Sequence, residues 1–283
     1  MIGVDGGGTS CRVVLWVPGM EGLHEAVLGP ANASTNFDAA VTTISDAIGT
    51  VAAKAGLSIR DLEDASAHFG LAGVMNAGIS ANVAAHFTFR RLTVTDDRPT
   101  TIAGALGERD GTVAAIGTGS FVGRQVAGQV RGIGGWGFYI GDQASGAWLL
   151  RRCFEEVMLS VDGLTPATDL TRSILAAHGD DPGQIVQFSL TARPADYATL
   201  AREVVGAADR GDPLGLKLME EGAAYIRAAM AALGWREGED LCLVGGLGPA
   251  YGKWLDLPTL TPKGTALDGA LALAARAAEG VTS

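Results

Sequence analysis

Ile2-Gly3-Val4-Asp5-Gly6-Gly7-Gly8-Thr9-Ser10-Cys11-Arg12 opens the chain with a short apolar strand, an acidic residue, three glycines and two hydroxyls, and then a second strand. Glycine has no Cβ, so a turn built from it can adopt positive φ and approach a bulky polar ligand closely. Backbone N–H groups in such a turn form a concavity that binds anions. A hairpin needs only two glycines, so a third one beside Asp5 and Thr9 is more than a turn requires. This stretch alone leaves a phosphate-binding turn and a plain glycine-rich hairpin as equal alternatives.

Asp5 is the candidate metal ligand of this stretch, because it stands at the end of the strand. Mg²⁺ usually keeps several waters and takes one or two carboxylates. We therefore expect Asp5 to hold a hydrated Mg²⁺.

Composition limits the class of protein. The chain has 283 residues, 47% of them apolar, and a net charge of −10 without any run of Lys and Arg. This length suits one large domain or two ordinary ones, and the charge argues against nucleic acid and anionic membranes as partners. The three cysteines, Cys11, Cys153 and Cys242, are too far apart to suggest a disulfide framework or a metal cluster. With no long apolar run and no signal peptide, we expect a cytoplasmic protein.

The rest of the first half alternates strands with amphipathic helices. A strand near residue 95 delivers Asp96 and Asp97, and Arg98-Pro99 then interrupts the pattern. The predicted elements are strands at 11–17 and 23–28, a helix through 41–55, a strand at 67–71, a helix at 79–89, a strand at 92–95 and a helix at 100–106.

The second half repeats the order of the opening. A strand at 112–116 runs into Gly117-Thr118-Gly119-Ser120, and two more strands follow. Such a repeat of a glycine–hydroxyl turn indicates an internal duplication, in which the two halves would hold a polyphosphate from both sides. The further predicted elements are strands at 121–126 and 129–133, helices from 145, at 195–209 and at 214–233, a strand at 241–244 and a helix at 266–278.

Two common nucleotide motifs do not occur. The chain has no G-x-x-x-x-G-K-[ST] sequence, and Gly117, Gly119 and Gly123 have the wrong spacing for G-x-G-x-x-G and lead into a strand. A bound nucleotide would therefore contact hairpin turns.

The glycine motifs, taken together, resemble those of the actin/Hsp70/sugar-kinase superfamily. Asp5–Thr9 is similar to its first phosphate motif, Gly117–Ser120 to its second, and Gly245-Gly246-Leu247-Gly248 to its adenosine motif. Within the superfamily the chain resembles the N-acetylglucosamine kinase and BadF/BadG-type ATPase family. The stretches that carry this resemblance are Gly134-Gly135-Trp136-Gly137, Gly141-Asp142-Gln143-Ala144-Ser145-Gly146, Gly211-Asp212-Pro213 and Ala266-Leu267-Asp268-Gly269-Ala270.

The resemblance implies a duplicated ribonuclease H-like α/β fold, as in actin-like ATPases. We expect two domains, residues 1–108 and 109–283, with a nucleotide cleft between them. The C-terminal helix, residues 266–280, is expected to pack back on the first domain.

For chemistry, the resemblance implies transfer of the γ-phosphoryl group of ATP to the 6-hydroxyl of an amino sugar, with Mg²⁺ as cofactor. Such a transfer needs a carboxylate that orients the attacking hydroxyl and accepts its proton. By motif position this base is Asp97, and Asp96 has a lesser polar role. The alternative is that Asp96 or Asp97 only caps the following helix.

The same resemblance assigns the ligand contacts. Asn36, Asp142, Trp136 and Gly135 are expected at the sugar. Asn36 and Asp142 could instead cap helices, and Trp136 could be a core residue. The nucleotide would contact the three glycine motifs: Asp5, Gly6, Gly7, Gly8, Thr9, Gly117, Thr118, Gly119, Ser120, Gly245, Gly246 and Gly248.

One position departs from the relatives. Mammalian-type N-acetylglucosamine kinases have a polar residue after the second phosphate motif, where this chain has Phe121. Phe cannot hydrogen-bond an acetamido group, so glucosamine is favoured over N-acetylglucosamine. The alternative functions are an activator ATPase and a non-catalytic sugar or ATP sensor. Relatives are often dimers, so a homodimer is also expected.

Overall fold

The computed structural model describes residues 1–280, and these residues form two compact units. Unit 1 contains residues 1–110, 125–130 and 261–280, and unit 2 contains residues 111–124 and 131–260. Residues 281–283, which end the second predicted domain, lie outside the described residues. No helix within residues 1–280 combines the length and the apolar character needed to cross a membrane.

Unit 1 is built on a mixed sheet with strand order β3-β2-β1-β4-β5. Strand β1 pairs antiparallel with β2 and parallel with β4, and β4 pairs parallel with β5. The elements of this unit are β1 (Ile2–Gly6), β2 (Cys11–Leu15), β3 (His24–Leu28), α1 (Phe37–Lys54), the 3₁₀ helix η1 (Ile59–Leu62), β4 (Ser66–Leu71), α2 (Ala77–Ala84), β5 (Arg91–Thr95), α3 (Asp97–Leu106) and α11 (Ala266–Ala278).

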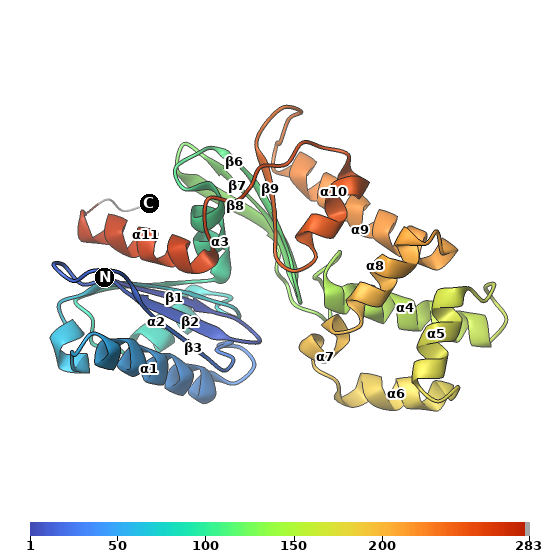
Figure 1. Ribbon diagram of the computed structural model, residues 1–283, viewed down its shortest axis with the longest axis horizontal. Helices are drawn as coiled ribbons and strands as arrows, with labels where there is room; N and C mark the ends of the chain where they lie inside the picture. The colour runs from blue at the N-terminus through green and yellow to red at the C-terminus, as the bar shows by residue number, and fades with distance from the viewer. Residues whose placement is uncertain (281–283) are drawn as a thin grey trace. The chain divides into compact units, whose positions relative to one another are not determined.

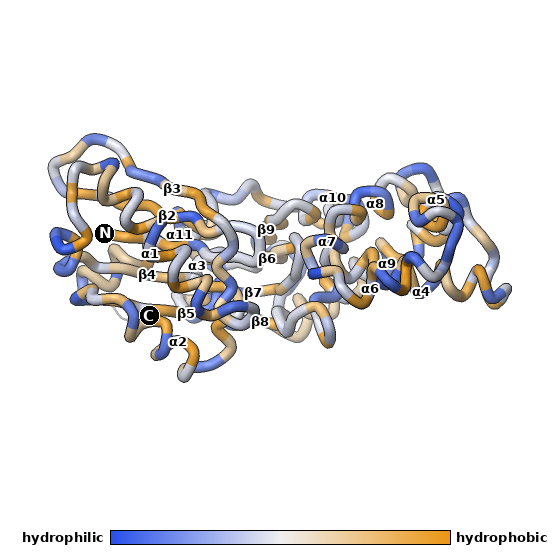
Figure 2. Tube along the Cα trace, turned by 90° about the horizontal axis from the view of Figure 1, so that it is seen from below, coloured by the Kyte–Doolittle hydropathy of each residue, from blue (hydrophilic) through white to orange (hydrophobic). Residues whose placement is uncertain are grey.

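Helices cover both faces of this sheet (Figure 1). Helix α1 packs on β2 and β3 through apolar residues such as Ile44 and Ile48, whose spacing of four places them on one helix face. Helix α11 lies on β1 and β4, and its backbone runs so close to β1 that a Cβ on Gly3 would lie 2.6 Å from the nitrogen of Leu271. In Figure 2 the tube of β4 is mostly apolar in colour, and every residue of this strand is buried, as expected for a strand that is covered on both faces.

Unit 2 repeats this topology. Its sheet has the order β8-β7-β6-β9, and Leu260 adds a parallel bridge beside Cys242 of β9, in the place that β5 takes in unit 1. Residues 125–130, the end of β7 and the start of β8, belong to unit 1. The elements of this half are β6 (Gly111–Ile116), β7 (Ser120–Val126), β8 (Gln129–Gly134), α4 (Gly146–Val161), α5 (Asp169–Ala177), α6 (Pro182–Thr191), α7 (Pro194–Ala198), α8 (Ala201–Asp209), α9 (Pro213–Ala232), β9 (Leu241–Val244) and α10 (Gly248–Leu255). The predicted α/β class with its duplication is confirmed.

The helical part of unit 2 differs most from the prediction. The structure contains α5, α6 and α10, none of which was predicted, and the helix predicted at 195–209 is divided into α7 and α8. These helices are short, and some depend on distant partners for their caps. Asp212, for example, accepts a hydrogen bond from the backbone N–H of Leu170, the second residue of α5, at 2.9 Å.

Two helices of unit 1 have ends that differ from the prediction. Helix α2 ends at Ala84 and not near residue 89, because Phe87 and Phe89 turn inward to pack edge-on against Phe69. Helix α3 begins at Asp97 and not at residue 100. Pro99 lies in its first turn, where a missing N–H leaves no hydrogen bond unmade.

Candidate active site

The carboxyl ends of β1, β4 and β5 meet at one edge of the unit 1 sheet, because these three strands are parallel. Asp5 is the next-to-last residue of β1, and β5 ends at Thr95, directly before Asp96 and Asp97. The sheet therefore collects the candidate metal ligand and the candidate base at one edge, the usual ligand-binding edge of such sheets. Burial is the main cause of the raised pKa of Asp97, and the charge of Asp5 acts in the same direction.

Asp96 and Asp97 are adjacent in the sequence but have different surroundings. Asp96 is the N-cap of α3: its Oδ1 accepts the backbone N–H of Arg98 at 2.9 Å. Its carboxylate also pairs with the guanidinium of Arg98, at 2.9 Å from Nε and 2.7 Å from Nη2. Within residues 1–280, no other side chain donates a hydrogen bond to the carboxylate of Asp97. The capping role therefore belongs to Asp96, and the carboxylate of Asp97 is left for a ligand.

The electrostatics of Asp97 suit a proton acceptor. Burial of its carboxyl group raises the pKa of Asp97 to about 6, and the negative charges of Asp96 and Asp5 act in the same direction. Its own backbone N–H and the guanidinium of Arg98 oppose this rise. A base whose pKa lies close to the working pH accepts a proton readily and is still mostly ionised at neutral pH.

The first glycine turn is tight but leaves space at its tip. The backbone N–H of Gly7 donates to the carbonyl of Ser10 at 2.8 Å. A Cβ on Gly6 would lie 2.6 Å from Cδ2 of Leu71, whereas a Cβ on Gly8 would meet nothing within 4 Å. None of the three glycines has a positive φ. Packing explains Gly6, but nothing in the described part of the chain requires a glycine at position 8, so the open space there suits a ligand.

Asp5 has surroundings that fit a hydrated cation. Burial raises the pKa of Asp5, and the positive charge of Arg12 partly opposes this. Within residues 1–280 no group of three or more His, Cys, Asp or Glu side chains could form a complete metal cage. One or two carboxylates with waters and ligand phosphates are the usual Mg²⁺ environment, and Asp5 fits that donor set.

Asn36 caps a helix, which is one of the two roles predicted for it; the other is a contact with the sugar. Its Oδ1 accepts the backbone N–H of Ala39 at 3.1 Å, at the start of α1. The preceding loop is fastened to the site, because the N–H of Ala31 donates to the carbonyl of Gly7 at 2.9 Å. The side chain of Asn36 is exposed, and its amide nitrogen keeps its capacity to donate to a sugar hydroxyl.

Two glycine motifs meet in unit 2, at the ends of β6 and β9. The N–H of Leu247 donates to the carbonyl of Ile116 at 2.9 Å, and that of Gly146 to Gly117 at 2.8 Å. Gly245 has a φ of 83° and faces backbone, because its Cβ would lie 2.4 Å from the oxygen of Ile116. Gly246, by contrast, borders open space, and a Cβ on Gly117 would meet only the oxygen of Gly119, at 4.0 Å. The second phosphate motif and the adenosine motif are therefore neighbours here.

Asp142 connects the following loop to the second phosphate motif. It is buried with a φ of 58°, an uncommon conformation for a residue with a side chain. Its Oδ1 accepts the N–H of Gly137 at 3.2 Å, and Oδ2 lies 2.8 Å from the place of a Cβ on Gly119. Burial raises the pKa of Asp142, whereas hydrogen bonds from the backbone of Gly137 and Ser120 lower it in part. Asp142 does not cap α4; Ser145 does, by accepting the N–H of Trp148 at 3.1 Å.

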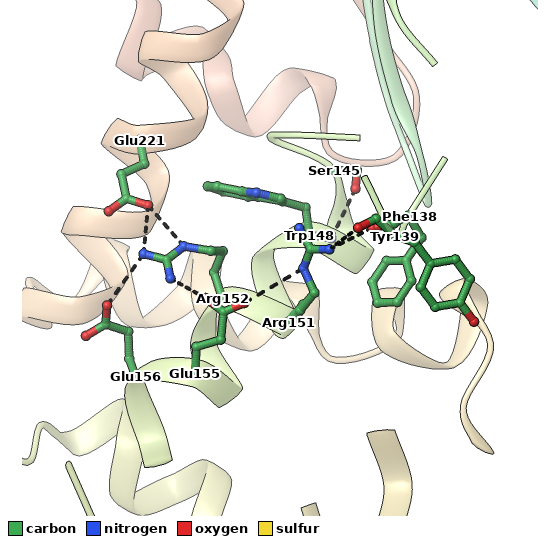
Figure 3. A network of polar contacts seen from close by, with 9 residues as sticks. All are labelled: Phe138, Tyr139, Ser145, Trp148, Arg151, Arg152, Glu155, Glu156 and Glu221. Atoms are coloured by element: carbon green, nitrogen blue, oxygen red, sulfur yellow. Dashed lines mark hydrogen bonds and ion pairs between the residues drawn. The ribbon is translucent and has the colours of Figure 1, made fainter. Parts of the chain in front are cut away.

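The loop between Gly135 and Asp142 exposes aromatic side chains and is held in place by hydrogen bonds from α4. Trp136 is 62% exposed, so the alternative that it is a core residue is wrong. Arg151 of α4 holds the loop: Figure 3 shows its guanidinium directed at the carbonyl of Phe138, 2.8 Å away, and at that of Tyr139. The buried ring of Phe138 lies under the same guanidinium at 5.3 Å. No pattern in the sequence predicted this role of Arg151.

Helix α4, which carries Arg151, is fastened in turn to α9. The guanidinium of Arg152 contacts Glu155 and Glu156 on its own helix and Glu221 on α9 (Figure 3). Lys217 of α9 adds a 2.7 Å bond to the buried Glu156. This network fixes the helix whose first residues contact the second phosphate motif.

The predicted site residues thus form two groups, one in each unit. In unit 1 the group consists of Asp5, Gly6, Gly7, Gly8, Thr9, Asn36 and Asp97. In unit 2 it consists of Gly117, Thr118, Gly119, Ser120, Gly135, Trp136, Asp142, Gly245, Gly246 and Gly248. The predicted cleft between the domains stays a prediction.

Comparison with known proteins gives one family along most of the chain. The model of the BadF/BadG/BcrA/BcrD ATPase family matches residues 2–256. Glucosamine kinase GspK of Vibrio cholerae is 34% identical, over 97% of this chain and 95% of that protein. The N-acetylmuramic acid/N-acetylglucosamine kinase of Clostridium acetobutylicum is 27% identical, over 82% of this chain and 78% of that protein.

Solved structures give the same result. A candidate N-acetylglucosamine kinase from Chromobacterium violaceum is 33% identical and superposes with a TM-score of 0.85, covering 96% of this chain and 98% of that one. A ROK family glucokinase from Streptomyces griseus, in complex with glucose and AMPPNP, has a TM-score of 0.57 at 16% identity, covering 99% of both chains. This second likeness concerns the fold alone.

Proposed function

Because the chain belongs to the BadF/BadG/BcrA/BcrD ATPase family, we propose that it is an ATP-dependent amino-sugar kinase. It transfers the γ-phosphoryl group of ATP to the 6-hydroxyl of glucosamine or N-acetylglucosamine. The observation that carries this proposal is the gathering of Asp5, the open glycine turn and the unpaired carboxylate of Asp97 at one sheet edge. The similarity to glucosamine kinase GspK over nearly the whole of both chains supports it.

Each group at this edge has a task in the transfer. Asp97 orients the sugar hydroxyl and takes up its proton, and the N–H groups of the first glycine turn bind phosphate oxygens. In unit 2, Gly117–Ser120 binds further phosphate oxygens, and Gly245–Gly248 contacts the adenosine. Asn36 and Asp142 hydrogen-bond sugar hydroxyls, and Trp136 and Gly135 border the sugar.

Mg²⁺ is the proposed cofactor, held by Asp5 directly or through water. When bound, the ion neutralises charge on the phosphates. The raised pKa of Asp5 is consistent with a site for a cation, because a buried carboxylate without a full partner gains from one.

Glucosamine is the favoured substrate. Phe121, which follows the second phosphate motif, is buried in β7 and offers no polar atom to an acetamido group. The predicted homodimer and cytoplasmic location stay predictions.

The experiment that tests the function is a coupled assay of ADP release with Mg·ATP and glucosamine, N-acetylglucosamine, glucose or no sugar. We expect strong release with glucosamine, weaker release with N-acetylglucosamine, and only a trace without sugar. Release of ADP at the same rate with and without every sugar would contradict the kinase and favour the activator ATPase. ATP binding without any release would favour the sensor.

The activator alternative has less support from the cysteines. The resemblance implies that such proteins hold an iron–sulfur cluster between two copies. Cys11, Cys153 and Cys242 are each 0% exposed and lie in β2, α4 and β9. Burial also raises the pKa of Cys11 and Cys153 to about 12, which disfavours the thiolate that a metal needs.

The open space at Gly8 leads to a prediction about ATP. We expect Gly8→Ala to fold as stably as the wild type, because the added methyl meets nothing within 4 Å. It should raise the KM for ATP by about tenfold or more, since the methyl fills space that a phosphate needs. Steady-state kinetics and thermal melting check both parts. Gly29→Ala, which also adds a methyl in open space, is the matched control and should leave the KM unchanged.

A further inference from the structure

Ala144 has an unfavourable backbone conformation two residues after Asp142, the candidate sugar ligand. Its φ is 71°, in the left-handed region that favours glycine, although Ala144 carries a Cβ and is buried. A residue other than glycine keeps such a conformation only where its surroundings hold it there, and positions of this kind gather at functional sites. The groups that hold Ala144 therefore bear on the place of Asp142.

Side chains hold both of the peptide groups that flank Ala144. The carbonyl of Gln143 accepts a hydrogen bond from Oγ of Ser120 at 2.5 Å. The carbonyl of Ala144 accepts one from the hydroxyl of Tyr251 at 2.9 Å. Because peptide groups are planar, φ and ψ of Ala144 are the two rotations that relate these two planes. One hydrogen bond on each plane thus fixes the left-handed conformation.

Tyr251 is suited to this task because its hydroxyl has little freedom. The side chain belongs to α10 and is 0% exposed. Its tip is confined by α9, since a Cβ on Gly222 would lie 2.3 Å from the hydroxyl oxygen. Burial raises the pKa of Tyr251 far above its ordinary value, so the hydroxyl keeps its proton and remains a donor. The ring therefore delivers one hydrogen bond at a fixed place.

The conformation of Ala144 decides where Asp142 lies. On the C-terminal side the chain is fixed, because Ser145 is the N-cap of α4. In the observed conformation the chain places Oδ2 of Asp142 2.8 Å from the position of a Cβ on Gly119, and Oδ1 accepts the N–H of Gly137 at 3.2 Å. A different rotation at Ala144 would turn the carboxylate away from both.

We propose that Tyr251 is a positioning residue for the sugar: by holding the carbonyl of Ala144 it keeps Asp142 directed at the sugar hydroxyls. This inference rests on the proposed kinase function, in which Asp142 contacts the sugar. Tyr251 acts through Asp142, because its own hydroxyl is buried and already donates to Ala144. Without this donor the carbonyl of Ala144 would lack a partner, and an unpaired buried carbonyl is unfavourable. The loop would then leave its strained conformation.

Tyr251→Phe removes the hydroxyl and keeps the ring, and Tyr197→Phe is the matched control. Tyr197 is also buried and packs on Phe138 of the same loop, with ring centroids 4.7 Å apart, but within residues 1–280 its hydroxyl makes no hydrogen bond. For Tyr251→Phe we expect the KM for the sugar to rise about tenfold, the effect of one buried hydrogen bond. Its kcat and its KM for ATP should stay within about twofold of the wild type. Tyr197→Phe should match the wild type in all three.

Ala144→Gly tests whether the backbone conformation carries the effect. Glycine adopts a positive φ without strain, so the loop no longer needs the hydrogen bond to keep its conformation. The double variant Tyr251→Phe/Ala144→Gly should recover most of the sugar affinity, and Ala144→Gly alone should keep the wild-type KM. Hydrogen exchange of the Gly137 N–H, which donates to Asp142, reports the place of the carboxylate without any turnover. It should be about tenfold faster in Tyr251→Phe and return to the wild-type rate in the double variant.

Three results would overturn the inference. One is a sugar KM of Tyr251→Phe equal to that of Tyr197→Phe. Another is a rise in the KM for ATP as large as that for the sugar, because Tyr251 would then only fix α10, which begins at Gly248 of the adenosine motif. The third is a double variant that recovers none of the sugar affinity. Failure of the kinase function is distinguishable: the wild type itself would phosphorylate no amino sugar, whereas the exchange of the Gly137 N–H would still respond to Tyr251→Phe.

Discussion

Asp97→Asn should lower kcat by about 10²–10⁴-fold, the usual contribution of a general base, and leave the affinities for ATP and sugar nearly unchanged. Asparagine keeps the size and the hydrogen-bonding capacity of the side chain but cannot take up the proton of the sugar hydroxyl. The variant should also fold, because the N-cap of α3 is supplied by Asp96. Single-turnover rates with the preferred amino sugar, together with calorimetric binding of each substrate, measure the two parts separately.

The raised pKa of Asp97 gives the same prediction a pH dependence. A base with a pKa of about 6 loses its function as the pH falls through that value, so kcat/KM should decline below about pH 6. For stability the sign is opposite, because the folded state disfavours the ionised carboxyl group. Stability is lost as the pH rises from the unfolded pKa near 4 through 6. At neutral pH Asp97→Asn should therefore melt at the same temperature as the wild type or higher.

Asp96→Asn is the control for this pair of acids. It removes the charge that pairs with Arg98 but keeps an oxygen that can cap α3. We expect a moderate loss of stability and a much smaller loss of kcat than in Asp97→Asn. If Asp96→Asn were the more damaging change to turnover, or if Asp97→Asn kept near-wild-type kcat, the assignment of the base would be wrong.

Local patterns in the sequence predicted the repeated part of the fold because both halves begin with the same pattern. An apolar strand runs into a glycine-rich turn at Gly6 and again at Gly117, and the strand at 241–244 has the predicted bounds. These signals are short-range: strand periodicity and turn composition lie within about ten residues of each other. The duplication could therefore be read before any tertiary contact was known.

The helical part of unit 2 was only partly predictable in this way. The helices from 145 and at 214–233 were predicted, and the one predicted at 195–209 is divided into α7 and α8, whereas α5 and α6 are too short for a clear periodic signal. Asp212 serves two helices at once, since it caps α9 by accepting the N–H groups of Leu214 and Gly215 and also accepts that of Leu170. A residue that is 42 positions away in the sequence leaves no local pattern.

At the site, the sequence identified residue types but left the roles of neighbouring residues open. Asp96 and Asp97 differ only in which one faces the backbone N–H of Arg98, and that depends on where α3 begins. The glycines show the same limit. Their number indicated a ligand turn, but only the structure separates Gly245, whose φ is 83°, from Gly8, which borders open space.

Gly269→Ala should cost about 3 kcal/mol of stability, at the upper end of the usual range for overpacking. Helices α3 and α11 touch backbone to backbone at this glycine. A Cβ there would lie 1.9 Å from the oxygen of Thr100 and 2.5 Å from the nitrogen of Gly104. Gly104 faces the same crossing, where its own Cβ would lie 1.8 Å from the oxygen of Thr265. No side-chain rotation relieves a clash with backbone atoms, so one helix must move.

Helix α3, one of the two helices at this contact, begins with Asp97, so we also expect the folded fraction of Gly269→Ala to turn over more slowly than the wild type. Thermal melting and kcat at a temperature below the transition measure the two effects. Gly49→Ala is the control in α1: its Cβ would meet only Cδ1 of Ile59, at 3.8 Å. In a helix interior that change should stabilise by up to about 1 kcal/mol. A Gly269→Ala protein as stable as Gly49→Ala would mean that α3 and α11 do not pack at this distance, and that Ala266–Ala270 has another role than to position the helix of the base.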